Sequence, residues 1–173
     1  MAAESIEALA LRASDELAIM RTLARVARAQ DDLDPTAFRA CFANTVLLTA
    51  TVMFGDWEPK EISADEFTRM TFERLRQADD GSKRAGHHMI FNHLIDIDGD
   101  TATCDADMYA LSVREDANGA KSAAAGGRYL MRLVRRGNHW LICERSVKLR
   151  YRYGDLALFG PAAAPAPVVE RPS

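Results

Sequence analysis

Asp31 and His88 are the residues of this chain whose types and surroundings best suit acid–base chemistry. Asp31 ends a helix-like run, Ala29-Gln30-Asp31, and His88 opens a strand-like run that continues to Leu94. A carboxylate that accepts a hydrogen bond from one imidazole nitrogen holds a histidine in one tautomer, and such a histidine can act as a general base near neutral pH. If the fold brings the two side chains together, we expect a small enzyme that abstracts protons.

Two further histidines, His87 and His93, lie close to His88 in the same run. Side chains alternate between the two faces of a strand, so His88 is predicted to share a face with Asn92, and His87 to share the other face with His93. His87 is therefore the second choice for the base. Adjacent strand residues diverge and no carboxylate stands at ligand spacing, so we predict no metal site. Gly126-Gly127 lacks the strand-turn-helix context of a phosphate loop, and we assign no cofactor.

The elements that must position this pair are predicted to be helices first and strands afterwards. Ser14 followed by two acids suits the start of a helix that ends near Asp31. Asp34-Pro35 suits the start of a second, short helix. Ser63-Ala64-Asp65-Glu66 has the pattern of a capping box that opens a third.

Five runs of β-branched and apolar residues predict strands, and hairpin-type turn residues separate the last four. The runs cover residues 45–54, 87–97, 101–113, 126–136 and 139–151. The four later strands should form an antiparallel meander. The run 87–97 carries apolar residues on both faces, whereas a free antiparallel sheet shows one polar face to water. We expect one face to enclose a pocket and the other to pack on a partner subunit, in a homodimer or homotrimer.

Size and charge restrict the possible partners. The 173 residues fit one domain, which we place at 14–158, between an N-terminal extension (1–13) and a flexible tail rich in proline and alanine (159–173). A net charge of −3 gives no electrostatic reason to expect nucleic acid or a membrane surface. The three widely spaced cysteines predict free thiols rather than disulfides, and we expect a cytoplasmic protein.

With these elements in place, the chain resembles the SnoaL-like branch of the nuclear transport factor 2-like superfamily. The motifs that carry the resemblance are Arg28-Ala29-Gln30-Asp31, Phe38-Arg39-Ala40-Cys41-Phe42-Ala43, His88-Met89-Ile90-Phe91-Asn92, Asp98-Gly99-Asp100-Thr101-Ala102, and Gly126-Gly127-Arg128-Tyr129 leading to Trp140. The resemblance implies an α+β fold shaped like a cone or barrel. Its N-terminal helices would pack on a strongly curved mixed or antiparallel sheet that encloses an apolar pocket.

Within the superfamily, the motifs resemble most the group of scytalone dehydratase, hexachlorocyclohexane dehydrochlorinase and bile acid dehydratase. The resemblance implies that Asp31 and His88 form a catalytic pair. It also implies that Arg135 or Arg136 assists a leaving group, and we assign Arg135 to substrate binding. Ala27 stands where the bile acid enzymes carry a tyrosine.

The resemblance therefore implies a cofactor-independent lyase or isomerase that acts on a hydrophobic, cyclic small molecule. We assign further substrate contacts to Asn92 and to side chains that belong either to the pocket wall or to the core. These are Phe54, Trp57, Met108 and Tyr129.

Two other functions remain open at this stage. One is a non-catalytic small subunit of a ring-hydroxylating dioxygenase, which has the same fold and would need a large iron-bearing partner. The other is a ligand-binding or polyketide-cyclase-like protein that uses the pocket with other residues. Asp31 and His88 lying too far apart to bond would favour the dioxygenase subunit.

Overall fold

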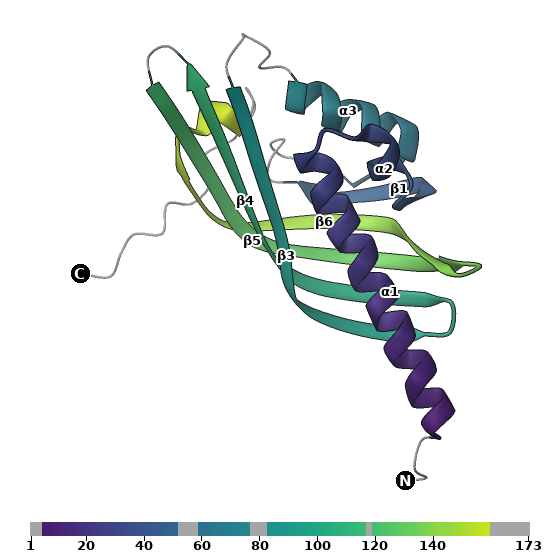
Figure 1. Cartoon of the computed structure of the whole chain (residues 1–173). Helices are drawn as coiled ribbons and strands as arrows, with labels where there is room; N and C mark the ends of the chain where they lie inside the picture. The colour runs from purple at the N-terminus through teal and green to yellow at the C-terminus, as the bar shows by residue number, and fades with distance from the viewer. Residues whose placement is uncertain (1–4, 52–58, 77–82, 117–118, 160–173) are drawn as a thin grey trace.

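Helices at the start of the chain pack on one face of a bent six-stranded sheet (Figure 1). This computed structural model describes residues 5–51, 59–76, 83–116 and 119–159. The helices are α1 (Ile6–Asp31), α2 (Pro35–Arg39) and α3 (Ala64–Arg76), with a short 3-10 helix η2 (Leu156–Phe159). The strands are β1 (Phe42–Thr51), β2 (Lys60–Ser63), β3 (Lys83–Asp98), β4 (Thr101–Asp116), β5 (Gly119–Arg136) and β6 (His139–Gly154).

The long helix α1 crosses the concave face of the sheet and begins earlier than predicted (Figure 1). Its N-cap is Ser5, whose hydroxyl accepts a hydrogen bond from the Ala8 amide, and not Ser14. The first two turns carry exposed apolar residues, such as Ile6 and Leu11. They have no buried face, so no apolar periodicity marks them as helical in the sequence. The helix ends at Asp31, as predicted. None of the described helices is long and apolar enough to span a bilayer.

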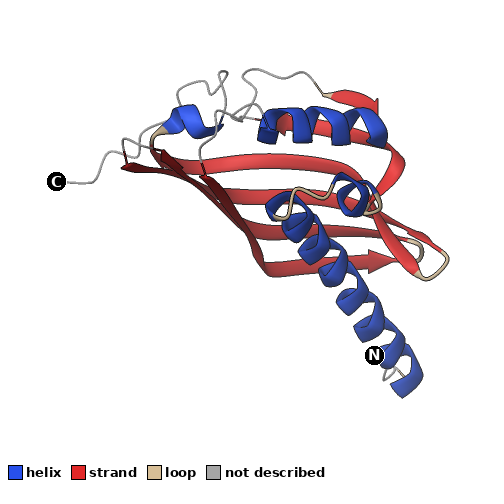
Figure 2. Cartoon of the chain, turned by 45° about the horizontal axis from the view of Figure 1, so that its top comes forward, coloured by secondary structure: helices blue, strands red, loops and turns tan. Residues whose placement is uncertain are grey.

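The other two helix starts agree with the predicted caps. Asp34 accepts a hydrogen bond from the Ala37 amide, and Pro35 occupies the first turn of α2. The Ser63 hydroxyl accepts a hydrogen bond from the Glu66 amide at the start of α3. Both side chains satisfy amides that have no partner inside their own helix. Figure 2 shows α1, α2 and α3 on one side of the strands.

The sheet has the order β2-β1-β6-β5-β4-β3 and is not closed. β3 to β6 form the predicted antiparallel meander, whereas β1 pairs with β6 in parallel and with β2 in antiparallel. The meander strands are longer than predicted: β3 starts at Lys83, where a loop was expected, and β5 starts at Gly119. The added strand ends carry polar or small residues, so no alternation of apolar residues marks them in the sequence. They pair with the neighbouring strand through backbone hydrogen bonds.

A bulge in β3 and one in β6 each reverse the facing of side chains within the strand. In β3 the register passes from Phe91↔Asp107 to Leu94↔Asp105, so Asn92 and His93 together oppose one residue of β4. Asn92 has a positive φ of 54°. In β6 the register passes from Glu144 to Ile142 against consecutive residues of β5. An extra residue on one strand moves every later side chain to the opposite face.

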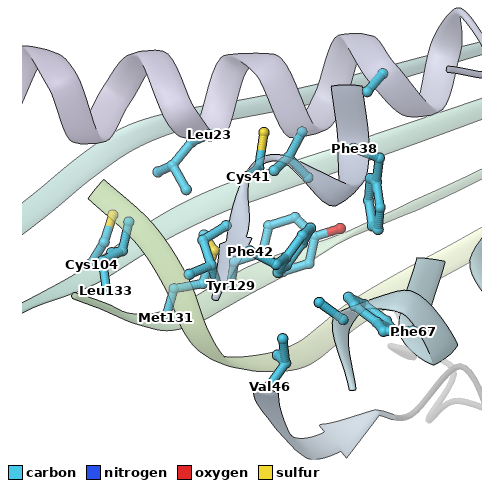
Figure 3. Close-up of a cluster of buried hydrophobic side chains, with 14 of the residues drawn as sticks. Leu23, Phe38, Cys41, Phe42, Val46, Phe67, Cys104, Tyr129, Met131 and Leu133 are labelled. Atoms are coloured by element: carbon cyan, nitrogen blue, oxygen red, sulfur yellow. The ribbon is translucent and has the colours of Figure 1, made fainter. Parts of the chain in front are cut away.

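The core lies between the helices and the concave face of the sheet. Phe38 of α2 packs at its centre, with ring centroids 4.8 Å from Phe42, 5.6 Å from Phe67 and 5.4 Å from Phe72. Figure 3 shows this aromatic group beside Leu23 of α1 and residues of the sheet. Truncating a fully buried phenylalanine of this kind costs about 3–5 kcal/mol. This cluster holds α1 against the sheet and so determines where the end of α1 lies.

Candidate functional site

The end of α1 brings Asp31 into direct contact with His88 on β3. Asp31 Oδ1 lies 2.6 Å from His88 Nδ1, and the backbone amide of His88 donates to both carboxylate oxygens at 3.0 Å. Both side chains are largely covered, with 16% and 15% of their surface exposed. The Asp31 carboxylate therefore binds both the backbone amide and the ring of a single strand residue. The spatial contact expected between these two residues is present.

This contact determines which imidazole nitrogen carries the proton. A carboxylate oxygen can only accept, so Nδ1 of His88 must be the donor. The neutral ring then keeps its lone pair on Nε2. Within the described part of the chain, Nε2 of His88 has no hydrogen-bonding partner. The geometry is that of a histidine oriented by an acid, with its basic nitrogen left open.

The neighbouring histidines are placed differently. His87 points outward, with 65% of its side chain exposed, and its Nδ1 lies 3.7 Å from Asp31 Oδ2, too far for a hydrogen bond. His93 was predicted on the face opposite His88, but the bulge at Asn92 turns it toward the half-buried side. Burial lowers the pKa of His93. No group of three or more metal-ligating side chains occurs among the residues described.

His88 lines a pocket between the sheet and the ends of α1 and α3. The pocket encloses about 50 Å³, and about 650 Å³ when the space open to solvent at its mouth is included. Its lining is Gln30, Arg74, Leu75, Arg84, His88, Met108, Ala110, Leu111, Ser112, Arg114, Ala125, Tyr129, Arg145 and Leu158. About half of the lining residues are apolar, whereas an apolar pocket was expected. Four guanidinium groups add a positive charge that the sequence analysis did not assign to it.

The four arginines line one partly buried space, and two of them, Arg74 and Arg84, have lowered pKa values. Burial lowers the pKa of Arg74 to about 10, and the nearby Arg145 and Arg84 add to this lowering. Burial and Arg114 lower the pKa of Arg84, whereas Asp31 acts in the opposite direction. One Arg84 nitrogen donates to the Leu75 carbonyl. Repulsion from neighbouring guanidinium groups thus adds to the lowering of both pKa values.

Arg145 is the most buried of these arginines, with 8% of its surface exposed. It donates to the Tyr129 hydroxyl at 2.6 Å, and its guanidinium carbon lies 4.4 Å from the centroid of the Tyr129 ring. If side chains alternated strictly along β6 from the buried Trp140, Arg145 would lie on the outer face of the sheet. The bulge in β6 turns it inward, together with Val147. Only the local excess of arginine in the sequence gives a hint of this cluster.

The predicted substrate-binding residues fall into three groups. Met108 and Tyr129 line the pocket with His88. Asn92 does not: the bulge turns it to the exposed face, where its amide donates to Asp107 at 2.9 Å, so the predicted shared face with His88 is wrong. Phe54 and Trp57 lie outside the described residues.

Arg135 was expected in the pocket but lies against the first half of α1. Its two terminal nitrogens donate to the two oxygens of Asp15, each at 2.6 Å, and its Nε donates to Asp100 at 3.0 Å. The Trp140 indole also donates to Asp15, at 3.1 Å. All the charged donors of Arg135 are thus engaged in a structural cluster. Its alternative, Arg136, is exposed and does not line the pocket either.

Comparison with known proteins places this site in a family context. Residues 11–146 match the sequence profile of the SnoaL-like domain. The Kfla4162 protein of Kribbella flavida has a similar structure, with a TM-score of 0.74, 19% identity, and coverage of 86% of this chain and 98% of that chain. A comparison with curated proteins found no match.

Two further similar structures carry names that indicate a chemistry. A protein of Novosphingobium aromaticivorans assigned as a scytalone dehydratase has a TM-score of 0.69 at 15% identity, covering 92% of this chain and 97% of that chain. A type 2 hexachlorocyclohexane dehydrochlorinase has a TM-score of 0.64 at 14% identity, covering 91% and 97%. At these identities the likeness establishes the fold alone. It confirms the cone-like α+β architecture expected from the sequence.

Proposed function

The chain belongs to the SnoaL-like domain family, and on that premise we propose that it is a lyase or isomerase whose base is His88. The observation that carries the proposal is the 2.6 Å contact of His88 Nδ1 with Asp31, which leaves Nε2 without a partner among the described residues while His88 lines a pocket. The substrate is a small molecule with a hydrophobic body that fits the apolar part of the wall.

The proposed step moves one proton and one electron pair. His88 Nε2 takes a proton from a substrate carbon, and the electrons of that C–H bond form a new carbon–carbon double bond. In an elimination, the leaving group departs from the neighbouring carbon with its own bonding pair. In an isomerisation, the π electrons of a neighbouring double bond shift to its far carbon, which takes the proton back from His88. In both cases Asp31 stabilises the imidazolium that forms, because the carboxylate already accepts the Nδ1 proton.

The other two functions considered from the sequence have less support. A structural subunit of a dioxygenase has no need of a histidine oriented by a buried acid, and the separation of Asp31 and His88 that would favour it is not found. A protein that only binds a ligand would have no need of the open Nε2. Structural relatives assigned as a dehydratase and a dehydrochlorinase are consistent with elimination chemistry.

A substrate screen with three proteins tests the proposal. Hydrophobic cyclic alcohols, halides and enones are offered to the wild type, to His88→Ala and to His87→Ala, and the new double bond is followed by its absorbance. The proposal requires turnover in the wild type and His87→Ala that His88→Ala lacks. Equal turnover by all three proteins would overturn the assignment of the base.

A further inference from the structure

Arg145 is a buried cation whose partners in the described part of the chain include no carboxylate. It is 8% exposed, and the Tyr129 hydroxyl is its only hydrogen-bond acceptor among these residues. Its guanidinium also faces two aromatic rings, Tyr129 at 4.4 Å and Phe67 at 5.8 Å. A hydroxyl and two ring faces attract a cation without neutralising it. A buried charge is normally paired.

Arginines elsewhere in the same fold do find carboxylates. The pairs are Arg39–Asp65 at 2.7 Å, Arg69–Glu73 at 2.7 Å, Arg128–Asp105 at 3.1 Å and Arg135–Asp15 at 2.6 Å. Three of these arginines have side chains that are 29–58% exposed, where pairing matters least for stability. Arg145, which has the greatest need of a counter-charge, lies in a pocket whose described lining contains no acid.

The acid nearest to the pocket cannot serve this purpose. Asp31 already accepts three hydrogen bonds from His88, two from its backbone amide and one from its ring. It also lies beside Arg84: a methyl group built on Gly86 would be 3.7 Å from Asp31 Oδ1 and 3.8 Å from an Arg84 nitrogen. The charge of Asp31 is thus shared between His88 and Arg84. Arg145 remains uncompensated at the other side of the pocket.

We propose that the substrate of this site is an organic anion: a hydrophobic ring system that carries a carboxylate or a phosphate group, which Arg145 binds. The inference deepens the proposed function and names the substrate class of the same pocket. A guanidinium donates two parallel hydrogen bonds to such a group, which fixes its orientation as well as its charge. Leu75, Met108 and Leu158 supply apolar contacts for the ring. The anion would hold the substrate so that one carbon faces His88.

Binding of matched ring compounds tests the proposal without any need for turnover. The probes are 2-naphthoate, 2-naphthyl phosphate and the uncharged 2-naphthamide, with titration followed by calorimetry and by the shift in melting temperature. At least one of the two anions should bind tenfold or more tightly than the amide, and the tighter one identifies the anionic group. Equal affinity for all three, or no binding by any, would overturn the proposal.

Two variants show whether Arg145 is responsible. Arg145→Met keeps an unbranched but shorter side chain and removes the charge, so the preference for the anion should fall to within twofold. Arg132→Met removes an exposed arginine of the neighbouring strand β5 and should leave the preference unchanged. A preference that survives in Arg145→Met would contradict the role of Arg145. Because the buried substitution can impair folding, the wild-type comparison of anion and amide stands as a test by itself.

The binding test and the base assignment fail in different ways. If His88→Ala binds the anion as well as the wild type but His88 proves unnecessary for turnover, the substrate class stands and the proposed function falls. If a substrate is turned over by His88 but its uncharged analogue is processed equally well, the proposed function stands and the anion site falls.

Discussion

Helix α1 bonds to the sheet through two aspartates, the buried Asp15 in its first half and the half-buried Asp31 at its last residue, and the two sites differ in how completely their groups are used. In the first half of the helix, Asp15 accepts two hydrogen bonds from Arg135 and one from Trp140, and Arg135 also binds Asp100. At the last residue, Asp31 binds His88, which lines the pocket and whose second ring nitrogen has no partner among the described residues. We call these the Asp15 cluster and the Asp31 pair.

The difference shows how a structural site and a candidate reactive site can be made from similar parts. In the Asp15 cluster opposite charges are matched, and the planar Arg135 stacks 4.5 Å from the Trp140 ring centroid. The charged groups of Asp15 and Arg135 all have partners within the cluster, so none of them needs a ligand. At the Asp31 pair, the imidazole Nε2 has no partner among the described residues, and Arg145 in the same pocket has no carboxylate partner among them. A substitution in the Asp15 cluster should therefore affect stability, and one in the Asp31 pair should affect chemistry.

The largest expected effect is on turnover. His88→Ala should lower kcat by about 10³-fold or more, since a positioned base typically contributes 10²–10⁴-fold. The free energy of unfolding should fall by about 1–2 kcal/mol, because Asp31 loses the ring hydrogen bond but keeps the backbone amide of residue 88. His87→Ala, its matched control, removes an exposed ring near the same carboxylate and should leave kcat within about twofold, a small difference on the free-energy scale. Steady-state kinetics would check both; equal losses in the two variants would erase the distinction between them.

The converse experiment removes the charge from the Asp15 cluster. Asp15→Asn should lower the free energy of unfolding by about 2–3 kcal/mol, less than the 3–5 kcal/mol of a fully buried pair, since Arg135 is partly exposed and keeps Asp100. Urea denaturation measures the loss, with the exposed Asp96→Asn as control. The folded variant should keep the wild-type kcat. A loss of kcat without a loss of stability would reverse the roles of the two sites.

The pH dependence of stability follows from the same cluster. Hydrogen bonds from Arg135, partly opposed by burial, lower the pKa of Asp15 below its ordinary value of 3.8. A lowered pKa means that the unfolded chain takes up the proton first, so the stabilisation is complete above about pH 5 and is lost as the pH falls below 4. The stability difference between the wild type and Asp15→Asn should therefore shrink at low pH. A difference that stays constant from pH 7 to pH 3 would contradict this pairing.

The smallest effect concerns the hydroxyl that holds Arg145. Tyr129→Phe keeps the ring and removes the acceptor at 2.6 Å, so it should cost about 1–2 kcal/mol of stability. The affinity for a naphthalene anion should fall several-fold, because Arg145 loses its fixed orientation. Calorimetry on the variant and the wild type measures both changes. An unchanged anion affinity would indicate that Tyr129 does not position Arg145.

Much of the frame that carries the Asp31 pair could be predicted from local patterns. The end of α1 at Asp31, the caps at Asp34 and Ser63, and the meander of β3 to β6 all follow from cap residues, turn residues and alternation. These signals are local, so tertiary packing does not override them. The start of α1 was misplaced because its first turns project from the sheet with no buried stripe.

The pocket itself was harder to predict, and the bulges are the reason. Alternation places Asn92 beside His88 and places Arg145 outside the sheet, and a single extra residue in each strand reverses both predictions. Arg135 was assigned to the pocket by resemblance, whereas its partner Asp15 looked like an ordinary acid in a first helical turn. Contacts between residues so distant in sequence leave no local pattern. The cationic wall, assembled from α3, β3, β4 and β6, is the clearest case.

The central claim is that Asp31 fixes the tautomer of His88, and nitrogen-15 NMR of the imidazole tests it most directly. Signals of the four histidines are assigned with His88→Ala, and spectra are recorded at a pH where the ring is neutral. The account predicts a proton on Nδ1 and a lone pair on Nε2 in the wild type, with this preference reduced in Asp31→Asn. A proton found on Nε2, or a tautomer unchanged by Asp31→Asn, would contradict it.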